Sequence, residues 1–165
     1  MQELRVLLET TQPINDEIRS AWFALPIDEE ELQERLGVDI ESEDYHILEK
    51  ELPFADDVGE DTTIERLNDM YRTFETLPAD IKEDYEDLMC YFSNLDELHQ
   101  NRHDIIHYSW CKNMTDVAHH LLDNDPAFSS LSESIVRYFD FEAYGDNLDN
   151  NGNFLETEHG IYEIP

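Results

Sequence analysis

The sequence predicts an α+β protein made of three small modules in an elongated row. Three observations lead to this class. Short apolar and aromatic runs ending at Pro26 and Pro53 are typical of strands, apolar residues recur at helical spacing from Thr62 onward, and β-branched and aromatic residues return in the last third. The expected modules are an antiparallel sheet with one helix (residues 1–61), an all-helical middle (62–102) and a C-terminal α/β module (103–165).

The first module is predicted from three strand signals and one helix signal. The runs LRVLLE, RSAWFALP and YHILEKELP are expected to form a three-stranded antiparallel sheet. Between the second and third runs, Asp28 can cap a helix, with Glu31 at its third position. Gly37 can end that helix, because glycine readily adopts the left-handed conformation found after many helices.

The other two modules follow from helical spacing and turn residues. Apolar residues between 64 and 77 share one helical face, a second helix is expected after Pro78, and Asn94 can cap a third. In the last module, DIIHYSW is expected to be a strand, and NMTDVAHHLLD a helix capped by Asn113. SESIVRYFDFEAYGDNL should hold one or two further helices, and NFLETEHGIYEI a hairpin turning at His159 and Gly160.

The charge is strongly negative throughout. Asp and Glu number 41 against 10 Lys and Arg, a formal net charge of −31, and acidic residues dominate each module. A hydrophobic content of 40% with 8 Phe, 8 Tyr and 2 Trp is too apolar for a disordered acidic tail. No basic leader and no run of ~18 apolar residues is present, so a soluble, cytoplasmic protein without a membrane partner is expected.

The stretch NLDNNGNFLETE resembles a calcium-binding loop, but it lacks the helix that should follow. Asn147, Asp149 and Asn151 occupy alternate ligand positions, Gly152 the tight turn and Glu158 the twelfth position. The residues after the loop, HGIYEIP, contain a glycine and a proline and cannot form the exit helix. The stretch is interpreted as a turn between a helix and the hairpin, and no metal site is predicted.

No catalytic or cofactor site is predicted either. The stretch HDIIH has the spacing of a zinc-protease helix, but in a strand His103 and His107 would lie ~13 Å apart. A nucleophile made of Cys111 and His107 would need an electropositive environment, which this charge opposes. Cys90 and Cys111 are expected to be free thiols, one of them buried. The chain is therefore expected not to be an enzyme and to use no cofactor.

The charge has a physical counterpart in DNA. Duplex DNA carries about one negative charge per 1.7 Å of axis, so 31 net charges correspond to ~50 Å of duplex. Repulsion among so many negative charges opposes folding. This suggests that the acidic residues serve to bind a positively charged partner. A merely solvated acidic surface, or adaptation to high salt, remains the alternative on composition alone.

Four motifs add a family resemblance to the charge. AWFALPID (21–28), YHILEKELPF (45–54), YFDFEAYGDNLD (138–149) and HGIYEI (159–164), in this order, resemble the ArdA antirestriction family over essentially the whole chain. The resemblance implies a three-domain, elongated, dimeric mimic of bent B-form DNA. Such proteins occupy the DNA-binding cleft of type I restriction–modification enzymes and protect DNA entering with plasmids and transposons.

The resemblance also suggests where the partner and a second copy would bind. No catalytic residue carries over, because the family acts through distributed charge. One departure is Asp146 after Gly145, where the family often has a basic residue. A dimer contact is implied near Tyr138, Phe139, Phe141 and Tyr144. The carboxylates expected to mimic phosphates are Glu29, Glu30, Glu34, Asp39, Glu41, Glu43, Asp56, Asp57, Asp80, Glu83, Asp84, Asp87, Asp123, Asp125 and Asp146.

Two function classes therefore remain open from the sequence. One is a DNA-mimicking inhibitor of a type I specificity and methyltransferase core that binds no nucleic acid itself. The other is an acidic, non-enzymatic protein that binds another basic partner, such as a histone-like protein. Recovering the partner in a pull-down would separate the two.

Overall fold

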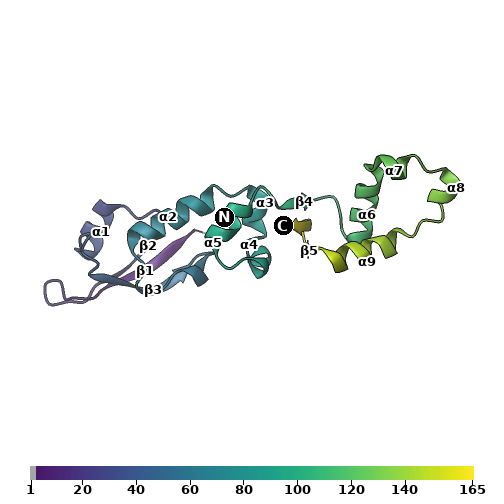
Figure 1. Cartoon of the computed structure of the whole chain (residues 1–165). Helices are drawn as coiled ribbons and strands as arrows, with labels where there is room; N and C mark the ends of the chain where they lie inside the picture. The colour runs from purple at the N-terminus through teal and green to yellow at the C-terminus, as the bar shows by residue number, and fades with distance from the viewer. Residues whose placement is uncertain (1–2) are drawn as a thin grey trace. The chain divides into compact units, whose positions relative to one another are not determined.

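The computed structural model describes residues 3–165 and divides into two compact units, one ending at His99 and one running from Gln100 to Pro165 (Figure 1). Each unit contains a three-stranded antiparallel sheet together with helices. The predicted α+β class is thereby confirmed. The finer division into three modules, and their elongated arrangement, stay predictions.

The sheet of the first unit has the order β2-β1-β3, with all neighbours antiparallel. Val6 and Leu8 on the central strand are fully buried, whereas Arg5 and Leu7 are only half-buried. Successive side chains of a strand point to opposite faces, so one face of the sheet builds the core and the other meets solvent. The three strands are β1 (Arg5–Thr10), β2 (Ser20–Ala24) and β3 (Tyr45–Glu51), as predicted.

Helix α1 (Glu29–Leu36) lies between β2 and β3, as predicted. It ends at Gly37, whose φ of 72° is the left-handed conformation that glycine adopts without steric cost. Asp28 occupies the N-cap position, but its side chain makes no capping hydrogen bond. Leu32 and Leu36 are the two buried residues of the helix, so α1 packs against the rest of the unit through few apolar side chains.

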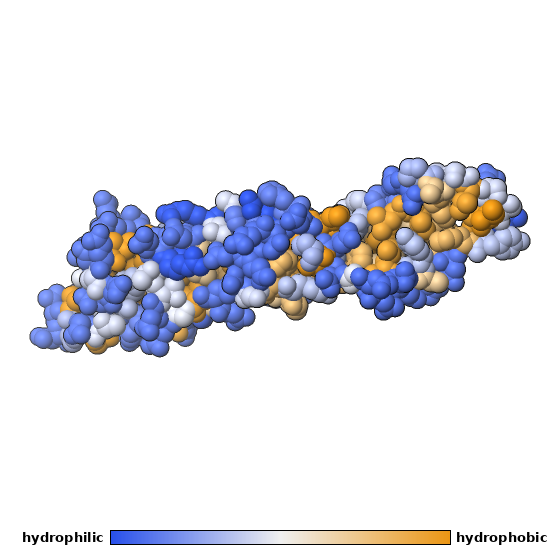
Figure 2. Space-filling view, viewed as in Figure 1, coloured by the Kyte–Doolittle hydropathy of each residue, from blue (hydrophilic) through white to orange (hydrophobic). Residues whose placement is uncertain are grey.

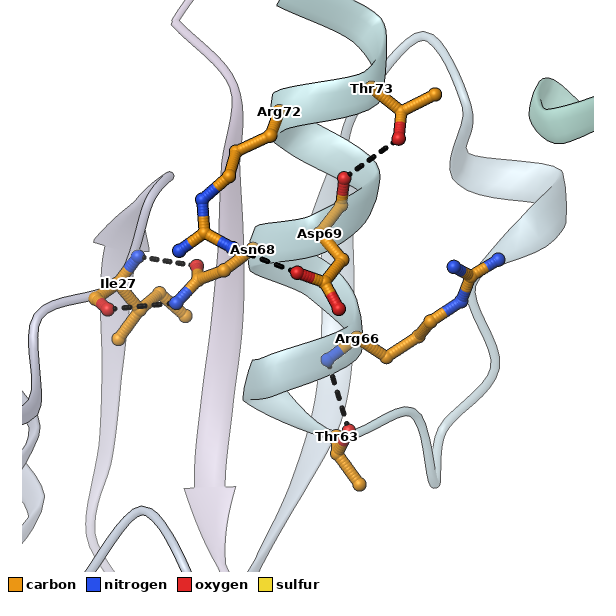
Figure 3. Close-up of polar contacts among 7 residues, drawn as sticks. All are labelled: Ile27, Thr63, Arg66, Asn68, Asp69, Arg72 and Thr73. Carbon is orange, nitrogen blue, oxygen red and sulfur yellow. Dashed lines mark hydrogen bonds and ion pairs between the residues drawn. The ribbon is translucent and has the colours of Figure 1, made fainter. Parts of the chain in front are cut away.

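Helix α2 (Ile64–Glu75) begins after Thr63, whose side chain accepts a hydrogen bond from the Arg66 amide at 3.1 Å. It joins the sheet where the Ile64 amide donates to the Tyr45 hydroxyl at 2.9 Å. Figure 3 shows a second link, in which the buried Asn68 side chain reaches from α2 to the backbone of Ile27. The helix is thus bonded both to β3 and to the segment that leads into α1.

The helix expected after Pro78 is interrupted at Asp84. Its φ and ψ of −102° and 23° are not helical, and this residue separates α3 from α4. Side chains of neighbouring helical residues project ~100° apart, and the break accompanies burial of both Asp84 and Tyr85, which are 5% and 3% exposed. The short elements of this region are η1 (Ala55–Asp57), α3 (Ala79–Glu83), α4 (Tyr85–Leu88), η2 (Met89–Tyr91) and α5 (Leu95–Asn101).

The sheet of the second unit has the order β4-β6-β5. The β5–β6 hairpin turns at Glu158 and His159, one residue before the predicted His159 and Gly160, and Gly160 is the first residue of β6. Gly160 has a φ of 121°, and a Cβ there would lie 2.5 Å from the Tyr108 carbonyl oxygen, so only glycine fits this close approach of strands. The three strands are β4 (Ile106–Tyr108), β5 (Asn153–Thr157) and β6 (Gly160–Ile164).

Two longer helices pack together in this unit, α6 (Met114–Asp123), capped by Asn113 as predicted, and α9 (Phe141–Asn151). They cross at Gly145, where a Cβ would lie only 2.7 Å from the Met114 carbonyl oxygen. The calcium-like stretch is helical through Asn151 and extended from Asn153, so the change to the hairpin occurs at Gly152. Two single-turn helices connect α6 to α9, namely α7 (Pro126–Ser129) and α8 (Glu133–Val136).

Candidate functional site

The predicted carboxylates of α1 lie on its exposed surface. Glu29, Glu30 and Glu34 are all exposed, and the first two stand in the first helical turn. Negative side chains are favourable there because the helix N-terminus carries a partial positive charge. Glu31 of the same turn is taken up by an ion pair with Arg35 at 3.0 Å. The helix therefore presents acidic side chains while its own cation is paired.

A turn after α1 exposes three further predicted carboxylates, Asp39, Glu41 and Glu43. The Asp39 side chain accepts a hydrogen bond from the Glu41 amide at 2.9 Å, which holds the turn. Glu43 has a φ of 57°, in the left-handed region that non-glycine residues seldom adopt. The Ser42 amide also donates to the Asp39 carbonyl oxygen at 3.1 Å, so Asp39 and Glu41 lie on a tight turn and Glu43 directly follows it.

The predicted acids of residues 56–87 differ in exposure. Asp56, Glu83 and Asp87 are exposed, Asp57 and Asp80 are half-buried, and Asp84 is only 5% exposed. Asp57 also accepts a hydrogen bond from the Leu95 amide at 2.8 Å and so anchors the start of α5. Burial, followed by the charges of Asp57 and Asp56, raises the pKa of the Tyr85 phenol. This group therefore contains acids on the surface together with Asp57, which holds the start of α5, and Asp84, which is buried.

The three predicted acids of the second unit are all exposed. Asp123 ends α6, Asp146 lies on α9, and Asp125 caps α7 by accepting a hydrogen bond from the Ala127 amide at 2.9 Å. Predicted carboxylates thus occur on the surface of both units. Each unit can present negative charge to a basic partner on its own.

At least half of the ten basic side chains form ion pairs within the described residues. The hydrogen bond between Arg5 and Glu51 raises the pKa of the arginine and lowers that of the carboxyl group. Pairs at such exposed positions contribute only ~0–1 kcal/mol each to stability. They do, however, neutralise the few cations locally. The pairs are Arg5–Glu51, Arg35–Glu31, Arg66–Asp96, Arg72–Asp69 and Lys82–Glu75, with nitrogen–oxygen distances of 2.6, 3.0, 2.8, 2.8 and 3.5 Å.

The second unit also carries an apolar surface over α6 to α9, visible as the orange area of Figure 2. Phe139 lies 5.0 Å from Phe141 and 5.9 Å from Tyr144 between ring centroids, so three of the four residues predicted for a dimer contact come together. Tyr138, the fourth, is 83% exposed. From residue 123 to residue 144 every residue is half-buried or exposed.

Sequence reasoning missed part of this aromatic surface. Phe128 packs edge-on against Phe139 at 5.1 Å, and His119 stacks on Phe141 at 3.8 Å. Leu131 and Ile135 lie between these aromatic residues in the chain and are 41% and 55% exposed. Leu131 and Ile135 follow Phe128 at intervals of three and four residues, as on one face of a helix, and this spacing could have predicted them from the sequence. We define the aromatic surface as His119, Phe128, Leu131, Ile135, Tyr138, Phe139, Phe141 and Tyr144.

The residues considered for metal or thiol chemistry serve other contacts. His107 lies in β4, stacks on Tyr162 at 4.0 Å between ring centroids and bonds the His159 carbonyl oxygen at 2.8 Å. Burial raises the pKa of the Cys111 thiol, which opposes thiolate formation, and Cys90 is an exposed free thiol. Within residues 3–165, no three His, Cys, Asp or Glu side chains gather as a metal site.

Among the described helices, none combines the length and apolar character needed to cross a lipid bilayer.

Comparison with known proteins identifies the family. The model of the family described as antirestriction protein (ArdA) matches residues 15–163. No curated protein matches the chain. The matched region contains all the carboxylates and aromatic residues predicted for partner and dimer contacts. The chain therefore belongs to the ArdA family of antirestriction proteins.

Proposed function

We propose that this antirestriction protein is an acidic mimic of B-form DNA that acts in the cytoplasm without binding nucleic acid. It occupies the DNA-binding cleft of type I restriction–modification enzymes at their specificity and methyltransferase core, and so protects incoming mobile DNA. The observation that carries this proposal is the placement of charge. Predicted carboxylates are exposed on both units, whereas at least half of the basic side chains are neutralised by ion pairs within the described residues.

This charge distribution suits a cleft that holds a DNA backbone. An enzyme that binds duplex DNA neutralises many phosphates with Lys and Arg, and much of its affinity is non-specific and electrostatic. A protein surface of many exposed carboxylates can engage the same cations. Each contact is weak, about 0–1 kcal/mol, so affinity must come from their number. The proposed contact set is the fourteen predicted carboxylates that are exposed or half-buried, because Asp84, only 5% exposed, lies inside the fold.

The aromatic surface is proposed as the contact between two copies of the chain. Obligate homodimer interfaces are enriched in aromatic and other apolar residues at their centre. A two-fold interface uses the same patch on both partners, so a single self-complementary surface is sufficient. Tyr138, 83% exposed, and Ile135, 55% exposed, are the side chains with most to gain from such burial. A dimer would double the length of DNA that the acidic surface can imitate.

A competition experiment tests the mimic. A type I methyltransferase core is bound to fluorescently labelled duplex DNA, and the protein is titrated in while anisotropy is followed. We expect the DNA to be released in full, with methylation inhibited over the same concentration range. A ternary complex containing both DNA and protein would refute the proposal. Failure to bind the core at all, with capture of another basic protein, would support the alternative class of acidic binding protein.

Sedimentation equilibrium tests the dimer. Ile135→Asp adds a charge to the aromatic surface and should shift the protein towards monomer. The matched control is Leu48→Asp on β3, because this leucine is similarly exposed, at 46%, but lies in the other unit. Equal dimerisation of all three proteins would show that the aromatic surface is not the contact.

A further inference from the structure

We propose that Asn68, which is uncharged and buried, is a positioning residue for the acidic helix α1. Its Oδ1 accepts a hydrogen bond from the Ile27 amide at 2.8 Å, and its Nδ2 donates to the Ile27 carbonyl oxygen at 3.0 Å. Both partners are buried, with Asn68 8% and Ile27 4% exposed. Figure 3 shows the side chain reaching from α2 to this backbone. This inference rests on the proposed function, since it concerns the carboxylates that α1 presents.

The position of Ile27 makes the contact important for α1. Ile27 directly precedes Asp28, the N-cap of α1, and the acidic first turn follows at once. The caps of α2, α6, α7 and α9 each accept a hydrogen bond through the side chain, but that of Asp28 does not. The start of α1, like the starts of α3, α4 and α8, therefore has no side-chain cap, and we infer that contacts from outside the helix hold it. Asn68 supplies it with both a donor and an acceptor.

The opposite end of α1 is held differently. Arg35 donates to the Trp22 carbonyl oxygen, and its guanidinium lies 4.7 Å from the centroid of the Phe23 ring. Leu32 and Leu36 add the buried contacts of the helix. Loss of the Asn68 bonds would therefore leave α1 attached at its C-terminal end, with freedom at the turn that carries Glu29 and Glu30. Displacing these carboxylates weakens several contacts with a basic cleft at once.

The experiment is a double-mutant cycle read out as inhibition of DNA methylation. One change is Asn68→Ala, and the other neutralises α1 by combining Glu29→Gln, Glu30→Gln and Glu34→Gln. We expect Asn68→Ala to reduce inhibitory potency about tenfold, as several weak ion pairs are lost together. In the neutralised background the same change should have almost no effect on potency, although it should still lower the melting temperature. A purely structural role would reduce potency equally in both backgrounds.

Two further variants keep the test decisive. Asn68→Asp preserves the size and the acceptor for the Ile27 amide but loses the donor, and it serves if Asn68→Ala does not fold. Asn68→Asp also makes the protein more acidic. If inhibition depended only on the number of negative charges, this variant would lose no potency, whereas the positioning role predicts a loss of potency. The control is Thr10→Val, which removes a part-buried hydrogen bond between β1 and Arg19, from the Arg19 amide to the Thr10 hydroxyl at 3.0 Å. We expect destabilisation there without loss of potency.

The outcomes separate this inference from the proposed function. If DNA and protein compete, but Asn68 variants lose equal potency in both backgrounds, the positioning role is refuted and the mimic stands. If neutralising α1 leaves potency unchanged, Asn68 has no carboxylates to position and the inference also fails. A ternary complex with DNA would instead refute the proposed function itself. Hydrogen exchange of the α1 amides gives an independent measurement, with faster exchange expected in Asn68→Ala.

Discussion

Replacing Gly145 with alanine tests the close crossing of α6 and α9. A Cβ at this position would lie 2.7 Å from the Met114 carbonyl oxygen and 2.8 Å from its carbonyl carbon. Both are backbone atoms, so the helices themselves would have to move. Overpacking of this kind typically costs ~1–3 kcal/mol. Alanine is the better helix former by ~1 kcal/mol, which offsets part of that cost.

We therefore expect Gly145→Ala to destabilise the second unit by up to ~2 kcal/mol, since the cost of overpacking exceeds the gain in helix propensity. A change of 1 kcal/mol shifts the melting temperature of a unit this small by ~4–8 °C, so calorimetry should record a fall of up to ~15 °C. Gly59→Ala is the control, because its Cβ would meet only Thr62 Oγ1, at 3.8 Å. An increase in the melting temperature of Gly145→Ala would refute the close crossing of α6 and α9, because the higher helix propensity of alanine would by itself raise the melting temperature.

Three further predictions concern charge and pH. Burial and a hydrogen bond to Glu163 raise the pKa of Tyr108 from 10.0 to about 12, so the stability due to its protonated form should be lost as pH rises from ~10 to ~12. Denaturant unfolding across this range should show a smaller loss for Tyr108→Phe. Glu29→Gln should reduce inhibitory potency less than about fivefold, and abolition by one exposed substitution would point to a localised site. Sodium chloride from 0.01 to 0.1 M shortens the Debye length from ~30 to ~10 Å, so the melting temperature should rise while inhibition weakens. Inhibition that does not change with salt would contradict the electrostatic mechanism.

Local patterns in the sequence predicted most elements of the fold. Strands end near Pro26 and Pro53, α1 ends at Gly37, and Asn94 and Asn113 cap their helices through side-chain bonds to nearby amides. These features depend on residues a few positions apart, so the chain itself carries the information. Charge and the order of four motifs also predicted the family, which the family model confirms.

Burial and long-range contacts were decided only by the tertiary structure. The helix expected after Pro78 is broken at Asp84, and this predicted surface carboxylate is buried together with Tyr85. An abundance of acidic residues cannot indicate which carboxylate will be buried. Whether the exposed members of the predicted set bind a partner stays a prediction.

By itself, the sequence determined the strands, most helices, the overall acidity and the family, because periodicity, capping and composition are local or additive properties. The tertiary structure alone decided that Asn68 meets Ile27, 41 positions away, and that Phe128 joins Phe139 and Phe141 on one surface. Such contacts depend on how separate segments pack. A polar residue on a helix shows no local sign of the backbone it will bond, and the position of α1 therefore became clear only in the folded chain.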